Sequence, residues 1–435
     1  MVHDDEPVGL DVVAVTFDDE RVVSDAGVAL VATLAERLGI ERLAVRLVRL
    51  RPGRPGSANA GRKVMALIFA MLLGADSIDD CELLRVGRTR RLLGGWVPAP
   101  STLGTFLRAF TFGHVRQLDQ LLAETLTRAW RAGAGPGNGR LVVDVDSFIG
   151  EVHGYKKQGA GFGYTKRRGY HPLVASRSDT GEVLHVRLRK GKANSSRGVL
   201  RFAEELIARV ARAGASGEKL LRADSAFWNK TLMGRLEKAG WCYSISIRCQ
   251  KGVNEVIAQV PESEWQTLAD YPEDGEAQIA ETTYDAQRMI VRRTRLIGPQ
   301  AELWPDWRHF PFLTNRTEAL SVIEAEHRQH AVVELTIRDL KDQALAHFPS
   351  GQFAANSAWT VIGAIAHNLT RWITVIGLPG QTVRTARTLR RRLLQIPGRL
   401  TRTARQWTLH LPARWPWQHD FIHALNRIRA LPALA

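Results

Sequence analysis

One stretch of the sequence, residues 321–346, places a single carboxylate in a row of side chains that can carry positive charge. It contains no Gly or Pro and is predicted to be one uninterrupted helix, with Ser321 and Glu324 as a capping box at its start. The row consists of His327, His330, Glu334, Arg338 and Lys341. At roughly 100° per residue these positions fall within about 40° of Glu334. An acid in such a row could bind a metal ion next to a polyanion. The alternative is a solvated helix face with ordinary i,i+4 ion pairs.

Three more acids lie at positions from which they could bind the same metal ion as Glu334. Asp144 and Asp146 are two residues apart on a predicted strand, so they face the same side of it. Asp224 follows directly after another predicted strand, 219–223, where it could instead cap the next helix. Acids that converge without a balancing base repel one another, and Mg²⁺ or Mn²⁺ bound by oxygen ligands relieves that repulsion. Two ions about 4 Å apart can activate a water or a 3′-hydroxyl and stabilise the leaving oxygen of a phosphodiester.

The order of the predicted elements brings these acids together. After a glycine-rich linker at 132–140 the order is β-β-β-α-β-α-β, which is that of the RNase H fold; the elements are 141–146, 160–177, 182–189, 196–213, 219–223, 228–239 and 241–246. In that fold the first and fourth strands are neighbours, and acids at the ends of these two strands lie at the same edge of the sheet. The fold class expected is therefore α/β, an RNase H-like catalytic core with a β-rich insertion before the last catalytic helix, plus helical N-terminal and C-terminal regions.

Three regions are expected along the chain. Residues 1–135 form a helical domain for DNA binding or dimerisation, after a lead-in with a short strand at 12–17. Residues 139–348 form the catalytic domain, with the β-rich insertion at about 250–320. Residues 349–435 form a helical, arginine-rich region. Within it, 384–405 carry eight arginines and no acid, which indicates either phosphate contact or a solvated arm.

The composition narrows the class of partner. The 435 residues are 45% hydrophobic, and 60 Lys and Arg against 44 Asp and Glu give a formal charge of +16. A chain this basic points to a polyanionic partner. The three cysteines form no CxxC pair, which argues against a zinc knuckle or a disulfide framework and fits a reduced cytoplasmic compartment. The longest apolar run, Val64–Leu73, is too short to span a bilayer, so no membrane partner is expected.

With these motifs the sequence resembles the DDE transposases of bacterial insertion sequences. Asp146-Ser followed by Val152-His-Gly resembles the first-Asp motif of that family, residues 163–173 resemble its second strand, and Arg222-Ala-Asp-Ser-Ala-Phe resembles the second-Asp motif. In the third motif Tyr, Arg, Glu and Lys recur with two, three and six residues between them. By that spacing Glu334 and Lys341 take the Glu and Lys positions, whereas His327 and His330 stand where Tyr and Arg are usual.

The resemblance implies cleavage at transposon ends and strand transfer to target DNA. Asp146, Asp224 and Glu334 are then the catalytic residues and the ligands of two Mg²⁺ ions, for which Mn²⁺ may substitute, and Asp144 is a helper or the alternative first ligand. The residues expected to contact DNA are Lys341, Arg338, His330, His327, Lys166, Arg167, Arg168, Lys190 and Lys192. Those from 166 to 192 either line the DNA path or form an exposed basic hairpin.

The expected partners are double-stranded DNA, as terminal inverted repeats and as target, and a second copy of the chain in the active complex. The expected compartment is the bacterial cytoplasm, on the nucleoid when DNA is bound. Two other classes stay open from the sequence. One is a metal-dependent nuclease of the same fold that cuts without strand transfer, and the other is an inactive DNA-binding descendant.

Overall fold

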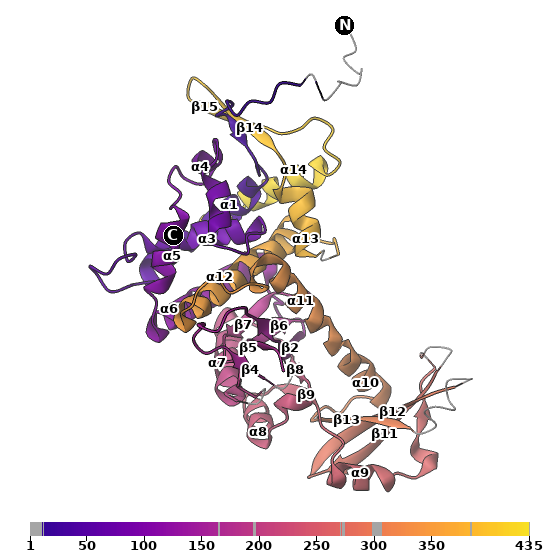
Figure 1. Ribbon diagram of the computed structural model, residues 1–435. Helices are drawn as coiled ribbons and strands as arrows, with labels where there is room; N and C mark the ends of the chain where they lie inside the picture. The colour runs from indigo at the N-terminus through magenta and orange to yellow at the C-terminus, as the bar shows by residue number, and fades with distance from the viewer. Residues whose placement is uncertain are drawn as a thin grey trace.

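A computed structural model describes residues 11, 13–163, 166–194, 197–269, 271, 275–297, 307–382 and 385–434. Helices from both ends of the chain gather above a central sheet, and a β-rich arm extends from the far side of that sheet (Figure 1). One apolar core runs through the N-terminal helices, the sheet and the C-terminal helices. The chain is therefore a mixed α/β protein in which sequence-distant helices share one core.

The central sheet has the strand order expected for an RNase H core. Its strands are β2 (Leu141–Ser147), β6 (Leu173–Arg177), β7 (Val183–Arg187), β8 (Lys219–Ala223) and β9 (Cys242–Ser246). Their spatial order is β7-β6-β2-β8-β9, with β8 parallel to β2 and to β9, and β6 antiparallel to β2. The run Leu-Val-Val on β2 suits a strand covered on both faces. The predicted core is thus confirmed, and β2 lies directly beside β8.

Smaller elements complete this core. The single strand predicted for 160–177 is divided, because β4 (Gly161–Phe162) and β5 (Arg168–Tyr170) form a separate three-stranded sheet with β3 (Gly150–Glu151) before β6 begins. Helix α7 (Val199–Ala213) and helix α8 (Lys230–Lys238) make the crossovers between strands. The helix expected from residue 196 begins at Val199, and residues 195 and 196 lie outside the described residues.

The predicted insertion is not an independent unit. It comprises α9 (Lys251–Ala258), β10 (Gln266–Thr267), β11 (Gly275–Tyr284), β12 (Gln287–Leu296) and β13 (Arg308–Thr314). Strand β13 pairs antiparallel with β9, from Phe312 opposite Ser246 to Thr314 opposite Ser244. The insertion therefore lengthens the core into one nine-stranded sheet, β10-β11-β12-β13-β9-β8-β2-β6-β7.

The helix predicted for 321–346 is one element with a change of winding in its middle. It comprises α10 (Leu320–Arg328), a 3₁₀ turn (Gln329–Val332), α11 (Val333–Leu340) and a π turn (Lys341–Leu345). It runs from the insertion to the core (Figure 1). The predicted capping box is wrong: α10 begins after Ala319 without a side-chain cap, and the buried Glu324 forms ion pairs with Arg328 and Arg292 instead.

The two ends of the chain pack together. The N-terminal helices are α1 (Val28–Arg37), α2 (Ile40–Leu47), α3 (Ala60–Leu72), α4 (Thr89–Leu92), α5 (Pro100–Arg108) and α6 (Phe112–Ala129), with a 3₁₀ helix at Asp79–Arg85. The C-terminal helices are α12 (Phe353–Trp372), α13 (Ala386–Leu389) and α14 (Gln418–Arg429). Helix α12 is buried against α3, α6 and β7. Among the described residues no helix is long and apolar enough to cross a membrane.

The terminal regions, expected to be helical apart from a short strand at 12–17, contain strands in other places. Strands β14 (Gly398–Thr403) and β15 (Gln406–His410) form a hairpin, and β14 also pairs with β1 (Val22–Val23). Leu400 and Leu409 pack on Val23 beneath this small sheet. Each alternates with polar residues along its own strand, and this alternation is hard to recognise in the sequence among so many arginines. Residues 13–17, where a strand was expected, form none, and residue 12 lies outside the described residues.

Candidate active site

Two aspartates meet where β2 and β8 end. In the parallel register Asp144 lies opposite Arg222 and Val145 opposite Ala223, so Asp146 and Asp224 follow at the same edge of the sheet. One carboxylate oxygen of Asp146 accepts the Ser147 N–H at 2.6 Å, and one oxygen of Asp224 accepts the Ala226 N–H at 3.0 Å. Asp224 thus caps a short 3₁₀ turn, as the alternative interpretation held, but this uses only one of its oxygens.

Glu334 reaches this edge from helix α11. Its side chain is exposed, and Asp146 and Asp224 are both partly buried. Burial raises the pKa of Asp146 to about 6; the Ser147 N–H lowers it, and the negative charges of Asp224 and Glu334 raise it further. Burial also raises the pKa of Asp224, against the Ala226 N–H and the positive charge of His330. The structure therefore brings Asp224 and Glu334 close enough to Asp146 for their negative charges to disfavour its ionisation.

No described lysine or arginine lies within ion-pair distance of these three acids, although the more distant charge of Arg248 lowers the pKa of Asp224. Among the described residues none of them forms an ion pair, and the second oxygens of Asp146 and Asp224 have no hydrogen-bond partner. Unpartnered carboxylate oxygens at a partly buried edge are suitable ligands for a hard divalent cation. By donor chemistry and charge, the residues present fit Mg²⁺ or Mn²⁺.

Asp144 is placed quite differently from Asp146. It is fully buried, and its two oxygens accept from Arg222 Nε at 2.7 Å and from an Arg222 terminal nitrogen at 2.8 Å. His330 Nδ1 lies 3.0 Å from the same carboxylate. Because a bidentate guanidinium and an imidazole already occupy its oxygens, Asp144 is poorly suited to hold a metal ion. This geometry favours Asp146 as the first ligand.

A groove of about 450 Å³ adjoins the acids. Glu334, His330 and Ser225 line it from the core, and Arg292 and Phe310 line it from the insertion. Arg292 stacks on the Phe310 ring at 5.0 Å, so the groove wall presents both a cation and an aromatic face. A wall of this kind is suited to nucleic acid, which offers phosphates and flat bases.

Lys341, one of the expected DNA contacts on the catalytic helix, lies at the same edge. Lys341 Nζ sits 5.0 Å from the centre of the Phe148 ring, two residues beyond Asp146, and Arg338 is exposed. His327 differs from the expectation. Its ring nitrogens lie 2.7 Å from Ser244 Oγ and 3.0 Å from Ser246 Oγ, and it stacks on Phe312. His327 therefore joins α10 to the sheet, and this arrangement leaves no ring nitrogen for phosphate.

The basic residues near β5 are surface residues. Lys166, Lys190 and Lys192 are exposed, and Arg167 pairs with Glu151. Arg168 donates to the main chain at 154 and 155 and stacks on the exposed Tyr155 ring at 5.2 Å. These positions are compatible both with a DNA path and with an exposed basic hairpin.

Sequence reasoning missed two residues of the site. The buried His171 lies 2.9 Å from Ser147 Oγ through Nε2, and its charge is among those that lower the pKa of Asp224. Arg222 is the partner of Asp144. Both belong to motif segments noted in the sequence, yet their roles depend on pairing across strands, which spacing along the chain does not reveal.

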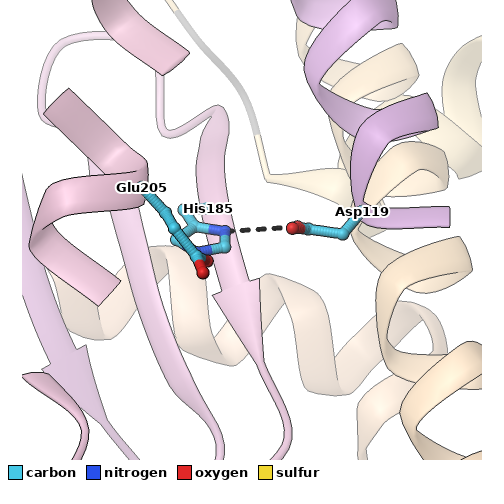
Figure 2. A group of neighbouring side chains, drawn as sticks. All are labelled: Asp119, His185 and Glu205. Atoms are coloured by element: carbon cyan, nitrogen blue, oxygen red, sulfur yellow. Dashed lines mark hydrogen bonds and ion pairs between the residues drawn. The ribbon is translucent and has the colours of Figure 1, made fainter. Parts of the chain in front are cut away.

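A second acidic cluster lies away from this edge. Asp119 on α6, His185 on β7 and Glu205 on α7 bring their ligand atoms within 4.8 Å of one another, the one described group of three that does so (Figure 2). Four arginines surround them: Arg116, Arg187, Arg201 and Arg209. Burial opposes ionisation of Asp119, but His185 and Arg209 outweigh it, so the pKa of Asp119 is far below its usual value. The surrounding charge is already positive, which argues against a bound cation.

The chain matches a known protein family over nearly its whole length. The family model described as "Transposase DDE domain group 1" matches residues 6–433. No curated protein matches the chain. One similar solved structure is the cryo-EM structure of a piggyBac transposase synaptic complex with hairpin DNA. It is 12% identical, with a TM-score of 0.48 over 86% of this chain and 80% of that chain.

Proposed function

The chain belongs to this family of DDE transposases, and we propose that Asp146, Asp224 and Glu334 are the carboxylates with which it cleaves and joins DNA. The observation that carries the proposal is their convergence at one sheet edge without an ion pair to any described lysine or arginine. The buried Asp144, with its own arginine, is not one of them.

These three side chains would hold the divalent ions of the reaction, Mg²⁺ with Mn²⁺ as a substitute. Bound ions of this kind supply an activated attacking oxygen and stabilise the leaving oxygen of the phosphodiester. The same chemistry serves two steps. A water cuts the strand at the transposon end and frees a 3′-hydroxyl, and that hydroxyl then attacks the target strand.

The chain's own cations would hold the DNA. Arg338 and Lys341 stand one and two helical turns beyond Glu334 on the same element, so they can bind phosphates next to the scissile bond. The groove lined by Arg292 and Phe310 would receive the adjoining nucleotides. Lys166, Arg167, Arg168, Lys190 and Lys192 would extend the contact along the duplex.

The DNA partners proposed are the terminal inverted repeats of the element and a target duplex, bound by two copies of the chain. The net charge of +16 supports a polyanionic partner of this size. We place the reaction in the cytoplasm, where the DNA lies. A dimer would allow both ends of the element to be processed together.

The test is divalent-metal-dependent cleavage of DNA that carries the element's own ends. Asp146→Ala, Asp224→Ala and Glu334→Ala should bind the ends but not cut them. A matched control is Asp342→Ala, because Asp342 lies on the same helical element and pairs with Arg387 at the surface. The control should cut normally.

The reaction products distinguish a transposase from a nuclease and from an inactive DNA-binding descendant. Joining of the cut end to a second duplex is expected of a transposase and not of a nuclease. Normal cutting by any one of the three variants would remove that residue from the proposal. Binding without cutting by the wild-type protein, with Mg²⁺ and with Mn²⁺, would favour an inactive DNA-binding descendant.

A further inference from the structure

Beneath the proposed metal ligands lies a buried ion pair that the reaction itself does not use. Asp144 is 0% exposed and Arg222 is 1% exposed. They are opposite one another on β2 and β8, and two parallel hydrogen bonds of 2.7 and 2.8 Å join them. Each therefore holds the other in one orientation, directly before the two aspartates that end these strands.

Arg222 also reaches the catalytic helix. Its guanidinium donates to the main-chain carbonyls of Glu326 and, at 3.4 Å, of Gln329, and to Ser178 Oγ at 2.7 Å. The two carbonyls lie where α10 changes into the 3₁₀ turn. At such a change of winding the main-chain bonding pattern changes, and Arg222 adds a charged donor to two carbonyls of this segment.

A third contact comes from the helix to the pair. His330, within the 3₁₀ turn, places Nδ1 3.0 Å from Asp144. Glu334 follows His330 by four residues, so it lies one turn further along the same face. The sheet thus contacts the helix at Glu326, Gln329 and His330, around the start of the 3₁₀ turn that leads into Glu334.

We infer that Asp144 and Arg222 are positioning residues, and that this Asp144–Arg222 clamp sets the place of Glu334 relative to Asp146 and Asp224. The inference rests on the proposed function. Glu334 needs such a device because it comes from an element far along the chain from the strands that carry the other two acids. A displacement of about 1 Å in a catalytic group can cost about 10²-fold in rate.

Two simpler interpretations predict different behaviour. If Asp144 were itself a ligand, its removal would change the number of ions bound. If the pair only contributed to stability, its removal would leave ion affinity unchanged in the fraction that stays folded. The clamp predicts an intermediate pattern, in which the number of ions is kept and their affinity falls.

The experiment is Mn²⁺ binding by calorimetry to the full chain, without DNA, alongside end binding by gel shift. Asp144→Asn removes the negative charge of the pair. Arg222→Lys keeps the positive charge but cannot form the two parallel hydrogen bonds of the guanidinium. Both should bind the wild-type number of ions and the wild-type amount of DNA, with Mn²⁺ affinity lowered about 10- to 100-fold, as for other residues that orient metal ligands.

The matched control is Asp119→Asn. Asp119 is also a buried aspartate paired with a buried arginine, Arg209 at 2.7 Å, but it makes no contact with the catalytic helix among the described residues. It should lose stability and keep Mn²⁺ affinity. If Asp144→Asn does not fold, Arg222→Lys gives the same test, since it retains a buried positive charge.

The outcomes are distinct. Unchanged Mn²⁺ affinity in Asp144→Asn or in Arg222→Lys would overturn the clamp and leave the proposed function intact. Loss of one bound ion in Asp144→Asn would also overturn it, and would make Asp144 a ligand. Identical Mn²⁺ binding by the wild-type chain and by Asp146→Asn would overturn the proposed function and the clamp with it.

Discussion

Two acidic clusters of this molecule differ in how their charge is balanced. The cluster of Asp119, His185 and Glu205 is the denser of the two, and its ligand atoms lie within 4.8 Å of one another. Arginines surround it: Arg209 lies 2.7 Å from Asp119, and Arg116 lies 2.9 Å from Glu205. The cluster of Asp146, Asp224 and Glu334 is looser and has no such arginine among the described residues.

In this molecule the compensation of charge, more than the density of acids, separates the proposed metal site from the arginine-paired cluster. Surrounding cations lower the pKa of Asp119 and of Glu205, although burial opposes this, so both carboxylates are held as salt-bridge partners. The pKa of Asp146 is raised instead, by burial and by Asp224 and Glu334. A divalent ion beside Asp146 would offset the cost of ionising that buried carboxyl. The same ion among Asp119, His185 and Glu205 would be repelled by the arginines around them.

The largest expected effect separates the clusters by activity. Asp146→Asn should lower the cleavage rate by at least about 10³-fold, since a metal ion at a phosphodiester contributes several kcal/mol to transition-state stabilisation. Asp119→Asn should cut at the wild-type rate when assayed below its unfolding temperature. Single-turnover cleavage of end DNA measures both. Comparable losses of cleavage rate in the two variants would show that the two clusters do not differ in their role in cleavage.

The next effect separates them by stability. Asp119→Ala leaves Arg209 buried without its partner, which typically costs about 3–5 kcal/mol. Asp146→Asn, by contrast, removes a carboxylate that its neighbours disfavour and should be neutral or stabilising without metal. Urea denaturation in EDTA compares the two. A destabilised Asp146→Asn would show that Asp146 has a structural partner.

A smaller effect tests the cations beside the looser cluster. Lys341→Ala should weaken cleavage about 10- to 100-fold, as expected from loss of one charged hydrogen bond to phosphate. Lys230→Ala is the matched control, because Lys230 is an exposed lysine on α8 that pairs with Asp285. Rates at saturating DNA measure the difference. Equal effects of the two substitutions would remove Lys341 from the site.

The smallest effect is a pH dependence of opposite sign for the two clusters. Asp146 has a folded pKa of about 6 against an ordinary 3.8, so without metal its contribution to stability is lost as pH rises through that window. Asp119 and Glu205 have lowered pKa values, so their contribution is present above their ordinary pKa and lost as pH falls. Asp146→Asn should flatten the decline between about pH 4 and 6, which thermal unfolding in EDTA would show.

The sequence predicted the looser cluster better than the denser one. Asp146 and Asp224 are visible because each stands at the end of a strand, and Glu334 because of its row of basic neighbours. The RNase H strand order, predicted from the order of the elements, and membership of the DDE transposases, predicted from the motifs, are confirmed. The roles of the individual site residues stay predictions.

What the sequence could not show depends on contacts between distant segments. His327 shares the helix face of Glu334, but the serines of β9 and Phe312 of the insertion turn it into a buried contact. Asp144 resembles Asp146 in every local respect, and only Arg222 on the neighbouring strand distinguishes them. Periodicity reports which face a residue occupies, and it does not report what packs against that face.

The measurement that tests the central claim most directly is an anomalous-diffraction map of crystals grown with Mn²⁺. We predict Mn²⁺ peaks beside Asp146, Asp224 and Glu334 and no peak within the cluster of Asp119, His185 and Glu205. A Mn²⁺ ion among those last three residues, with none beside Asp146, would contradict the account.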